Sequence, residues 1–207
     1  MTELRVVLVD DHPVVRAGLR AVLHAQPQIA VVADAASCDE ALAAVAAHQP
    51  DVVVTDLRLG DGVDGIETTK RLRALPNPPA VLVLSTYDRD AEIFGAINAG
   101  ASGYLLKDVP PEEIATAIAA AAAGESYFSS DIAQRVLRGL RNPPPTLTGR
   151  ERDVLKLLVT GASNREIAKS LVVSEATVKS HLVHIFDKLG VDSRARAIRT
   201  AQEMGLV

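Results

Sequence analysis

Cysteine and long apolar runs are both scarce in this sequence. Cys38 is the only cysteine among 207 residues, which excludes an intramolecular disulfide and a metal site made of cysteines alone. We interpret Cys38 as a small buried hydrophobe in a reducing cytoplasm. No apolar run reaches the roughly eighteen residues that a membrane span needs, and the short run near the N-terminus ends in Asp10 and Asp11, unlike a signal peptide. We therefore expect a cytoplasmic protein that does not insert into a membrane.

Apolar residues are nevertheless abundant, and charge is unevenly distributed. The apolar fraction of 48% predicts folded cores rather than wholesale disorder. The net charge of -4 conceals an acidic part and a basic part: residues 1–126 hold 18 Asp and Glu against 9 Lys and Arg, whereas residues 127–207 hold 8 against 13. This segregation favours one domain that handles cations or phosphoryl groups and another that binds a polyanion.

Short apolar runs alternate with helical patterns through the acidic part. Each run is typical of a buried parallel strand, and a stretch with helical spacing follows it. Five such units in roughly 125 residues predict an α/β domain with one doubly wound parallel sheet. The predicted strands lie at residues 4–9, 29–33, 51–56, 80–84 and 103–106.

Polar side chains end four of these strands. The first strand leads to Asp10 and Asp11, the third to Asp56, the fourth to Ser85 and the fifth to Lys107. Ligands of such sheets bind at the carboxyl ends of the strands. Clustered carboxylates repel one another unless a cation neutralises them, and hard oxygen ligands suit Mg²⁺. A lysine and a hydroxyl beside them supply the counter-charge and the hydrogen-bond donor that a phosphoryl group needs.

Residues 1–124 resemble a response-regulator receiver domain. The matching motifs are VDDH at 9–12, VVVTDLRL at 52–59, LST at 84–86 and GYLLKD at 103–108. The resemblance implies a flavodoxin-like fold with five strands in the order 2-1-3-4-5. It also implies that Asp56 accepts a phosphoryl group from a phosphohistidine on a sensor histidine kinase.

The same resemblance implies a role for each polar group of the site. Four groups would hold Mg²⁺, with Mn²⁺ as the alternative ion: the carboxylates of Asp10, Asp11 and Asp56 and the backbone carbonyl of Arg58. Three groups would respond to the phosphoryl group: Lys107 by its charge, Ser85 by a hydrogen bond, and Tyr104 by turning inward on activation.

The loop after the third strand departs from the receiver pattern. Gly60 stands where receivers usually have a proline, and residues 61–65 form a stretch one residue longer than is common. We expect these departures to affect the loop shape and the lifetime of the phosphoryl group. Arg58 and Tyr87 lie at positions that tune this lifetime in similar receivers. We interpret His12 as a loop or helix-start residue, because an imidazole suits a hard-cation site poorly.

Residues 125–146 join the acidic and the basic part. Apolar residues at helical spacing predict a connecting helix over 129–140, and the prolines at 143–145 predict an extended, stiff tether after it. The two domains are accordingly expected at 1–124 and 147–207. The tether has two interpretations that the sequence leaves open: a plain spacer, or a device through which the first domain masks and releases the second.

The basic part predicts a small all-α domain with a helix-turn-helix. Two capping-box patterns, Thr148 with Glu151 and Ser163 with Glu166, mark the starts of helices. Residues 164–171 and 175–189 have helical patterns, and three residues separate them. The second helix has an apolar stripe that predicts the side facing the core: Val178, Leu182, Ile185 and Leu189. The opposite side of this helix is small and polar with a cation near its start, as a helix in the DNA major groove requires.

Residues 147–197 resemble a LuxR-type DNA-binding domain through the segment LTGRERDVLKLLVTGASNREIAKSLVVSEATVKSHLVHIFDKLGVDSRARA. With the receiver, the whole chain resembles a NarL/FixJ-type response regulator. The resemblance implies that three side chains face bases: Lys179, Ser180 and Val183. It implies that three others contact the DNA backbone, namely Asn164, Thr177 and Lys188, and that the last helix pairs two copies through Ala197, Ile198 and Ala201. Valine at position 183, where relatives often have a polar or basic residue, offers a contact with a thymine methyl group.

The expected function is that of a DNA-binding transcription regulator switched by phosphorylation of Asp56, with phosphorylation promoting dimerisation and binding to double-stranded promoter DNA. We expect no enzyme activity beyond Mg²⁺-dependent phosphoacceptance and slow autodephosphorylation. One alternative is an aspartate-nucleophile phosphatase, but such enzymes typically carry an early Asp-x-Asp motif, and Asp10 is followed by Asp11 and His12. Another is a receiver that is never phosphorylated and only binds proteins, against which the complete set of polar site residues argues.

Overall fold

The computed structural model describes residues 3–60, 62–86, 89–141 and 147–206. The chain forms two compact units, and along α6 (Ser130–Arg141) the division falls between Leu137 and Arg138. In the described part of the chain, no helix combines the length and the apolar character of a membrane span. The prolines at 143–145, on which the predicted tether depends, lie outside the described residues, as does Tyr87.

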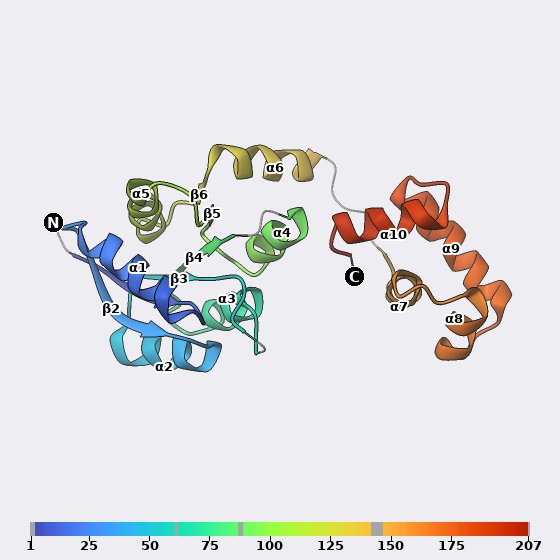
Figure 1. Cartoon of the computed structure of the whole chain (residues 1–207), viewed down its shortest axis with the longest axis horizontal. Coiled ribbons are helices and arrows are strands. Elements are labelled where there is room, and N and C mark those ends of the chain that lie inside the picture. The colour runs from blue at the N-terminus through green and yellow to red at the C-terminus, as the bar shows by residue number, and fades with distance from the viewer. Residues whose placement is uncertain (1–2, 61, 87–88, 142–146, 207) are drawn as a thin grey trace. The chain divides into compact units, whose positions relative to one another are not determined.

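The first unit is built on one parallel sheet of six strands in the order β2-β1-β3-β4-β5-β6 (Figure 1). The order predicted for the first five strands is confirmed. The sequence did not predict β6, which has only two residues and pairs with β5. The strands are β1 (Leu4–Val9), β2 (Ile29–Ala35), β3 (Val52–Thr55), β4 (Ala80–Ser85), β5 (Gly103–Leu106) and β6 (Tyr127–Phe128).

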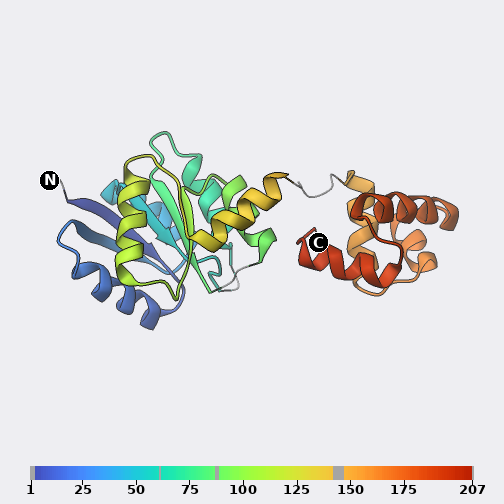
Figure 2. The ribbon, with the colours of Figure 1, turned by 90° about the horizontal axis from the view of Figure 1, so that it is seen from above.

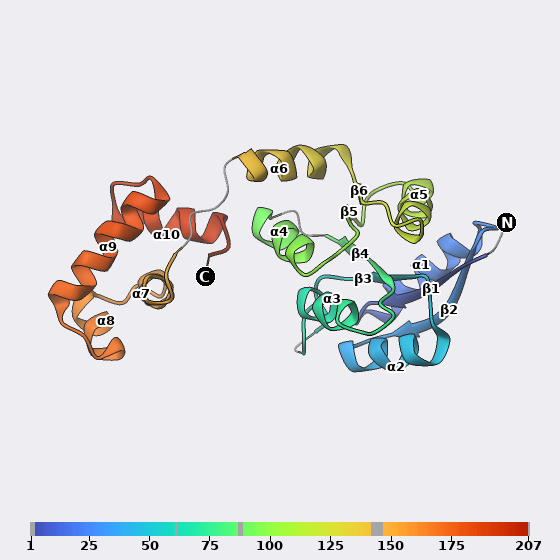
Figure 3. The same cartoon turned by 180° about the vertical axis from the view of Figure 1, so that it is seen from behind.

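Helices cover both faces of this sheet (Figures 2 and 3). In β1, Val6 and Leu8 pack in the cluster that contains residues of α1 and α5, whereas Val7 and Val9 pack in the cluster that contains residues of α2 and α3. Because both faces are covered, the strands are apolar at nearly every position rather than at alternate ones. The helices of this unit are α1 (Pro13–His24), α2 (Cys38–His48), α3 (Gly65–Arg73), α4 (Asp90–Asn98), α5 (Pro111–Ala122) and α6 (Ser130–Arg141), the last of which runs past the unit boundary.

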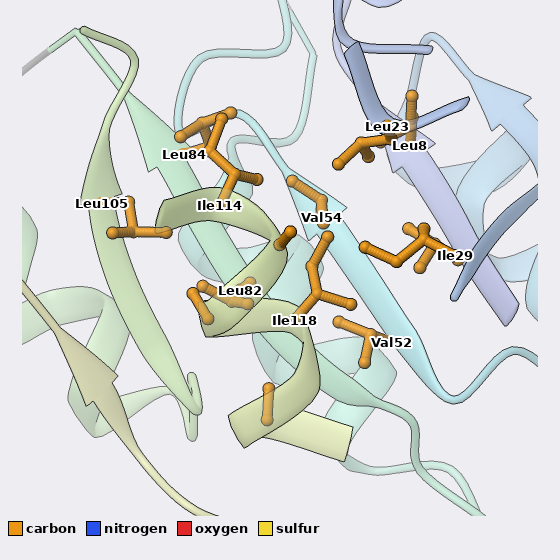
Figure 4. Close-up of a cluster of buried hydrophobic side chains, with 14 residues drawn as sticks. Leu8, Leu23, Ile29, Val52, Val54, Leu82, Leu84, Leu105, Ile114 and Ile118 are labelled. Carbon is orange, nitrogen blue, oxygen red and sulfur yellow. The ribbon is translucent and has the colours of Figure 1, made fainter. Parts of the chain in front are cut away.

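The largest core cluster of the first unit lies between the sheet and α5 (Figure 4). Ile114 and Ile118 of α5 pack with Val54 of β3 and Leu82 of β4, and the side chains of Val54 and Leu82 are at most 3% exposed. Such packing fixes the strands relative to one another, and so fixes the loops at their carboxyl ends.

The first unit continues past residue 124, through β6 and into α6. Ile132 of α6 is 1% exposed and packs in one cluster with Val83, Ile93 and Tyr104. Val136, one turn later, packs against the same cluster. The segment predicted as a connector therefore contributes core residues to the first unit.

The second unit is all-α, as predicted. The predicted capping boxes that start α7 and α8 are confirmed: Glu151 caps with Thr148, and Glu166 caps with Ser163. The turn between α8 and α9 contains Val172, whose φ of +55 is a left-handed conformation that is strained for a β-branched residue. The helices are α7 (Gly149–Val159), α8 (Asn164–Leu171), α9 (Glu175–Leu189) and α10 (Arg194–Glu203).

Candidate functional site

The polar residues predicted from the strand ends lie together at the carboxyl edge of the sheet. Asp10 directly follows β1, Asp56 follows β3, Ser85 ends β4, and Lys107 follows β5. Asp10, Asp56 and Ser85 are 1%, 8% and 0% exposed. Buried charges are costly unless they are paired, so the partners of these groups define the site.

Lys107 links two of the carboxylates. Its Nζ donates to Oδ2 of Asp10 at 2.6 Å and to Oδ2 of Asp56 at 2.8 Å. Burial of Lys107 would by itself lower its pKa, but the hydrogen bonds to Asp10 and Asp56 outweigh burial and raise the pKa above its ordinary value. Lys107 is therefore a charged partner held against the predicted phosphoacceptor, Asp56.

The Asp56 carboxylate is fixed from the backbone side as well. The amide of Leu57 donates to Oδ1 of Asp56 at 2.7 Å, and the amide of Asp56 donates to the carbonyl of Val9 at 2.8 Å. Gly65 lies so close that a Cβ there would clash with the carbonyl oxygen of Asp56. Only glycine at position 65 allows α3 to start against Asp56 in this way.

The acidic residues after β1 form the part of the site suited to a cation. Ligand atoms of Asp10, Asp11 and His12 lie within 4.8 Å of one another. Oδ1 of Asp11 is one of two buried side-chain oxygens in the described part of the chain that accept no hydrogen bond. His12 Nδ1 lies 2.8 Å from that oxygen, but the His12 side chain is 68% exposed and precedes Pro13 at the start of α1, as the helix-start interpretation predicts.

This donor set fits Mg²⁺ or Mn²⁺, because hard divalent cations prefer carboxylate oxygens and Oδ1 of Asp11 is buried without a hydrogen bond. The groups that would hold the ion are the carboxylates of Asp10, Asp11 and Asp56 and the backbone carbonyl of Arg58. Gly60 adopts a φ of +64 in the adjoining loop, and a Cβ at this position would lie 3.5 Å from Oδ2 of Asp11. A proline, with φ fixed near -65°, cannot adopt that conformation, which explains the glycine in this longer loop.

Ser85 and Tyr104 lie together behind Asp56. Their hydroxyl groups share a hydrogen bond, and both residues are 0% exposed. Burial raises the pKa of Tyr104 to about 12, while the hydrogen bond with Ser85 acts in the opposite direction. The ring of Tyr104 thus already lies inward, in the cluster with Ile132 of α6.

Arg58 has a partner that the sequence did not reveal. Its Nη2 donates to Oε1 of Glu92 on α4 at 2.7 Å, while Oε2 of Glu92 is the other buried oxygen that accepts no hydrogen bond among the described residues. This ion pair connects the loop after β3 with α4. No local pattern could have indicated it, because 34 residues separate the partners.

In the second unit, α9 has one buried and one exposed side. The predicted apolar stripe is confirmed, since each of its members is at most 8% exposed: Val178, Leu182, Ile185 and Leu189. The predicted base-facing residues Lys179, Ser180 and Val183 are all exposed, Val183 to 56%. α9 can therefore present these three side chains to a partner without unfolding.

The residues predicted to contact the DNA backbone have intramolecular partners. Oδ1 of Asn164 accepts from Arg194 at 3.5 Å, and the amide of Thr177 donates to Oγ of Ser174 at 3.1 Å, which caps α9. Lys188 donates to Glu151 at 2.6 Å, and the Glu151 side chain is 5% exposed. The backbone-contact role of these residues stays a prediction, and for Lys188 it competes with a buried partner.

The residues predicted to pair two copies point largely into their own unit. Ala197 and Ala201 are 0% exposed and belong to the hydrophobic core of the helical unit, and Ile198 packs against the same core. Pairing through α10 stays a prediction, and the buried alanine side chains cannot supply its contact surface. Exposed side chains of the same helix would have to do so.

Two family models match the chain. The response regulator receiver domain matches residues 6–119, and the bacterial regulatory proteins of the luxR family match residues 145–201. The chain belongs to the two-component response regulators with a LuxR-type DNA-binding domain. It is a transcription regulator, and the family that its motifs indicated is confirmed.

The regulator is similar to known proteins over its whole length. The transcriptional regulatory protein LiaR of Bacillus subtilis is 40% identical over 210 residues, with 99% of each chain covered. The solved structure of ChrA, the response regulator of a heme-sensing two-component system, is 43% identical with a TM-score of 0.59, and each chain is covered completely. The two-component response regulator RcsB in complex with DNA is 26% identical with a TM-score of 0.70, covering 98% of the regulator and 99% of RcsB.

Proposed function

We propose that phosphorylation of Asp56 by a sensor histidine kinase switches the regulator and promotes dimerisation and binding to double-stranded promoter DNA. The observation that carries this proposal is the Lys107 ammonium, bonded to both Asp10 and Asp56 at the carboxyl edge of the sheet. A lysine held against a nearly buried carboxylate is suited to phosphoryl oxygens once they arrive.

In the proposed transfer, a carboxylate oxygen of Asp56 attacks the phosphorus of the kinase phosphohistidine. A P–O bond forms, the P–N bond breaks, and its electron pair returns to the imidazole. Lys107 pairs with the phosphoryl oxygens, while the Leu57 amide holds the other carboxylate oxygen. Mg²⁺ or Mn²⁺, when bound by Asp10, Asp11, Asp56 and the Arg58 carbonyl, supplies positive charge that offsets the charge gathered during transfer.

The product would act on the groups behind Asp56. An aspartyl phosphate brings added negative charge and new acceptor oxygens, which favour donation by Ser85. Ser85 already shares a hydrogen bond with Tyr104, so a change at Ser85 reaches the cluster that contains Ile132. This chain of contacts supports a path from the acceptor to α6, the helix in which the two units divide.

The proposed output is DNA binding by α9. Lys179, Ser180 and Val183 would face bases in the major groove, and three other residues would contact the DNA backbone: Asn164, Thr177 and Lys188. The exposure of Lys179, Ser180 and Val183 on one side of α9 supports the base-facing role, and the similarity to the RcsB–DNA complex supports the mode of binding. The regulator would act in the cytoplasm as a homodimer when phosphorylated. It would have no enzyme activity beyond phosphoacceptance and slow autodephosphorylation.

The test compares the regulator with its Asp56→Asn variant on the regulator's own promoter DNA, each after incubation with Mg²⁺ and a small phosphodonor. Footprinting should show tighter binding by the treated regulator, and treatment should leave the variant unchanged. Equal binding by treated regulator and variant would remove the switch from the proposal, while leaving DNA binding intact.

A further inference from the structure

Val183 is an apolar side chain in a polar surface. The other exposed positions of α9 are polar or alanine: Glu175, Ala176, Thr177, Lys179, Ser180, His184, Asp187 and Lys188. A single exposed valine is common on protein surfaces and by itself indicates nothing. Its position is what matters, because Val183 is the exposed residue one helical turn after Lys179 and Ser180.

The spacing places Val183 beside the groups proposed to read bases. Residues three and four apart lie on the same side of a helix, so Val183 continues the surface formed by Lys179 and Ser180. Four residues advance about 6 Å along a helix, whereas successive base pairs of DNA are about 3.4 Å apart. Val183 would therefore meet a base pair one or two steps from the one that Lys179 contacts.

Valine can recognise only one kind of group in the major groove. Its side chain has no donor and no acceptor, so it cannot read the hydrogen-bonding edge of any base. The apolar group that the major groove offers is the 5-methyl of thymine. A cytosine amino group pressed against valine would instead lose water without gaining a partner.

We infer that Val183 is a specificity-determining residue that selects thymine through its 5-methyl group, one or two base pairs from the base pair contacted by Lys179. The inference rests on the proposed function, in which α9 enters the major groove. It adds the chemistry of one recognised base. A Val183 that instead contacted a second copy of the regulator would make binding independent of thymine methyl groups.

The experiment uses full-length regulator treated with Mg²⁺ and phosphodonor, and duplexes selected by it from a random pool. Each thymine of a selected half-site is replaced singly by uracil, which pairs identically but lacks the methyl group. Burial of one methyl group corresponds to about a fourfold change in affinity. We expect such a loss at one thymine in each half-site, and no loss when a thymine outside the half-site is replaced.

Two variants assign the methyl contact to Val183. Val183→Ala should bind thymine DNA about fourfold more weakly and be insensitive to uracil at that one position. Lys179→Ala should bind more weakly throughout yet keep its sensitivity to the methyl group. Val183 is exposed, so its replacement by alanine leaves the core of the unit unchanged.

The possible results separate the inference from the proposed function. Selected DNA that binds equally with thymine and uracil at every position overturns the inference and leaves DNA binding standing. A methyl effect that persists in Val183→Ala also overturns it, because another residue then reads the methyl group. Failure of the treated regulator to select any duplex contradicts the proposed function itself.

Discussion

The two functional regions of the regulator differ in how far their charged groups are buried and paired. At the predicted phosphoacceptor, Asp10 and Asp56 are nearly buried and Lys107 is bonded to both. On α9 the side chains proposed to face bases are exposed, and the buried carboxylate of that unit, Glu151, is bonded to Lys188 and to the start of α7. Covalent transfer needs charges fixed in advance where water is displaced, whereas base recognition needs groups that stay accessible until DNA arrives.

The stability of the first unit should depend strongly on the packing of the buried cluster around Tyr104. Ile132→Ala should lower the free energy of unfolding of the first unit by about 2–5 kcal/mol, because it leaves a cavity in a buried cluster. Denaturant unfolding followed by circular dichroism measures the change. Leu137→Ala is the matched control in the same helix: Leu137 is 54% exposed, and its loss should cost no more than about 0.5 kcal/mol. Equal effects of both variants would show that α6 does not pack as described.

Because the proposed base-facing residues of α9 are exposed, replacing one of them should weaken DNA binding without lowering the stability of the unit. Lys179→Ala should weaken binding to promoter DNA about 10- to 100-fold at fixed salt concentration, as expected when one good base contact is removed. Lys156→Ala removes the same charge from an exposed position on α7 and controls for general electrostatic attraction. Fluorescence anisotropy measures both affinities. Similar losses in the two variants would argue against a base contact by Lys179.

Glu151 is a buried charge whose effect on stability depends on pH. The hydrogen bond from Lys188 and then that from Thr148 lower its pKa from 4.5 to about 2. Because the folded value lies below the unfolded one, ionised Glu151 stabilises the fold fully above about pH 4.5, and this contribution is lost as the pH falls toward 2. Glu151→Gln should cost about 1–3 kcal/mol near neutral pH and less in acid.

A second capping glutamate provides the control for that pH series. Glu166 caps α8 in the same way with Ser163, but it is exposed and has no lysine partner in the described part of the chain. Glu166→Gln should therefore change stability far less than Glu151→Gln in urea unfolding at both pH values. A pH-independent cost of Glu151→Gln would mean that the Lys188 pair does not stabilise the unit.

The smallest predicted effect is a gain in stability. Val172 is 90% exposed with a φ of +55, a conformation that asparagine tolerates better than a β-branched residue. Val172→Asn should raise the free energy of unfolding by about 1 kcal/mol. Val183→Asn, at an exposed position with ordinary helical geometry, should give no such gain. Thermal unfolding of both variants would reveal whether the turn is strained.

What the sequence predicted depends on local pattern. Apolar runs ending in polar residues located the strands and the site, because parallel strands bring their carboxyl ends to one edge. Capping boxes located α7 and α8 for the same local reason. The packing of Ile132 in one cluster with Tyr104 and the pairing of Arg58 with Glu92 join distant segments, and no spacing rule indicates such contacts.

The pairing residues illustrate a different limit of the sequence. Ala197 and Ala201 are four residues apart and mark one side of α10, but spacing alone does not tell whether that side meets the unit's own core or a second copy. Their complete burial assigns the side to the core of the unit. The Glu151–Lys188 pair was hidden for a related reason, since the capping motif explained Glu151 fully without a lysine.

The most direct test of the central claim is the intact mass of the full-length regulator after incubation with Mg²⁺ and a small phosphodonor. The account predicts that the regulator gains the mass of one phosphoryl group, that chelating the divalent ion prevents the gain, and that Asp56→Asn gains nothing. A regulator that gains no mass, or an Asp56→Asn variant that gains as much as the unaltered chain, would contradict the assignment of Asp56 as the phosphoacceptor.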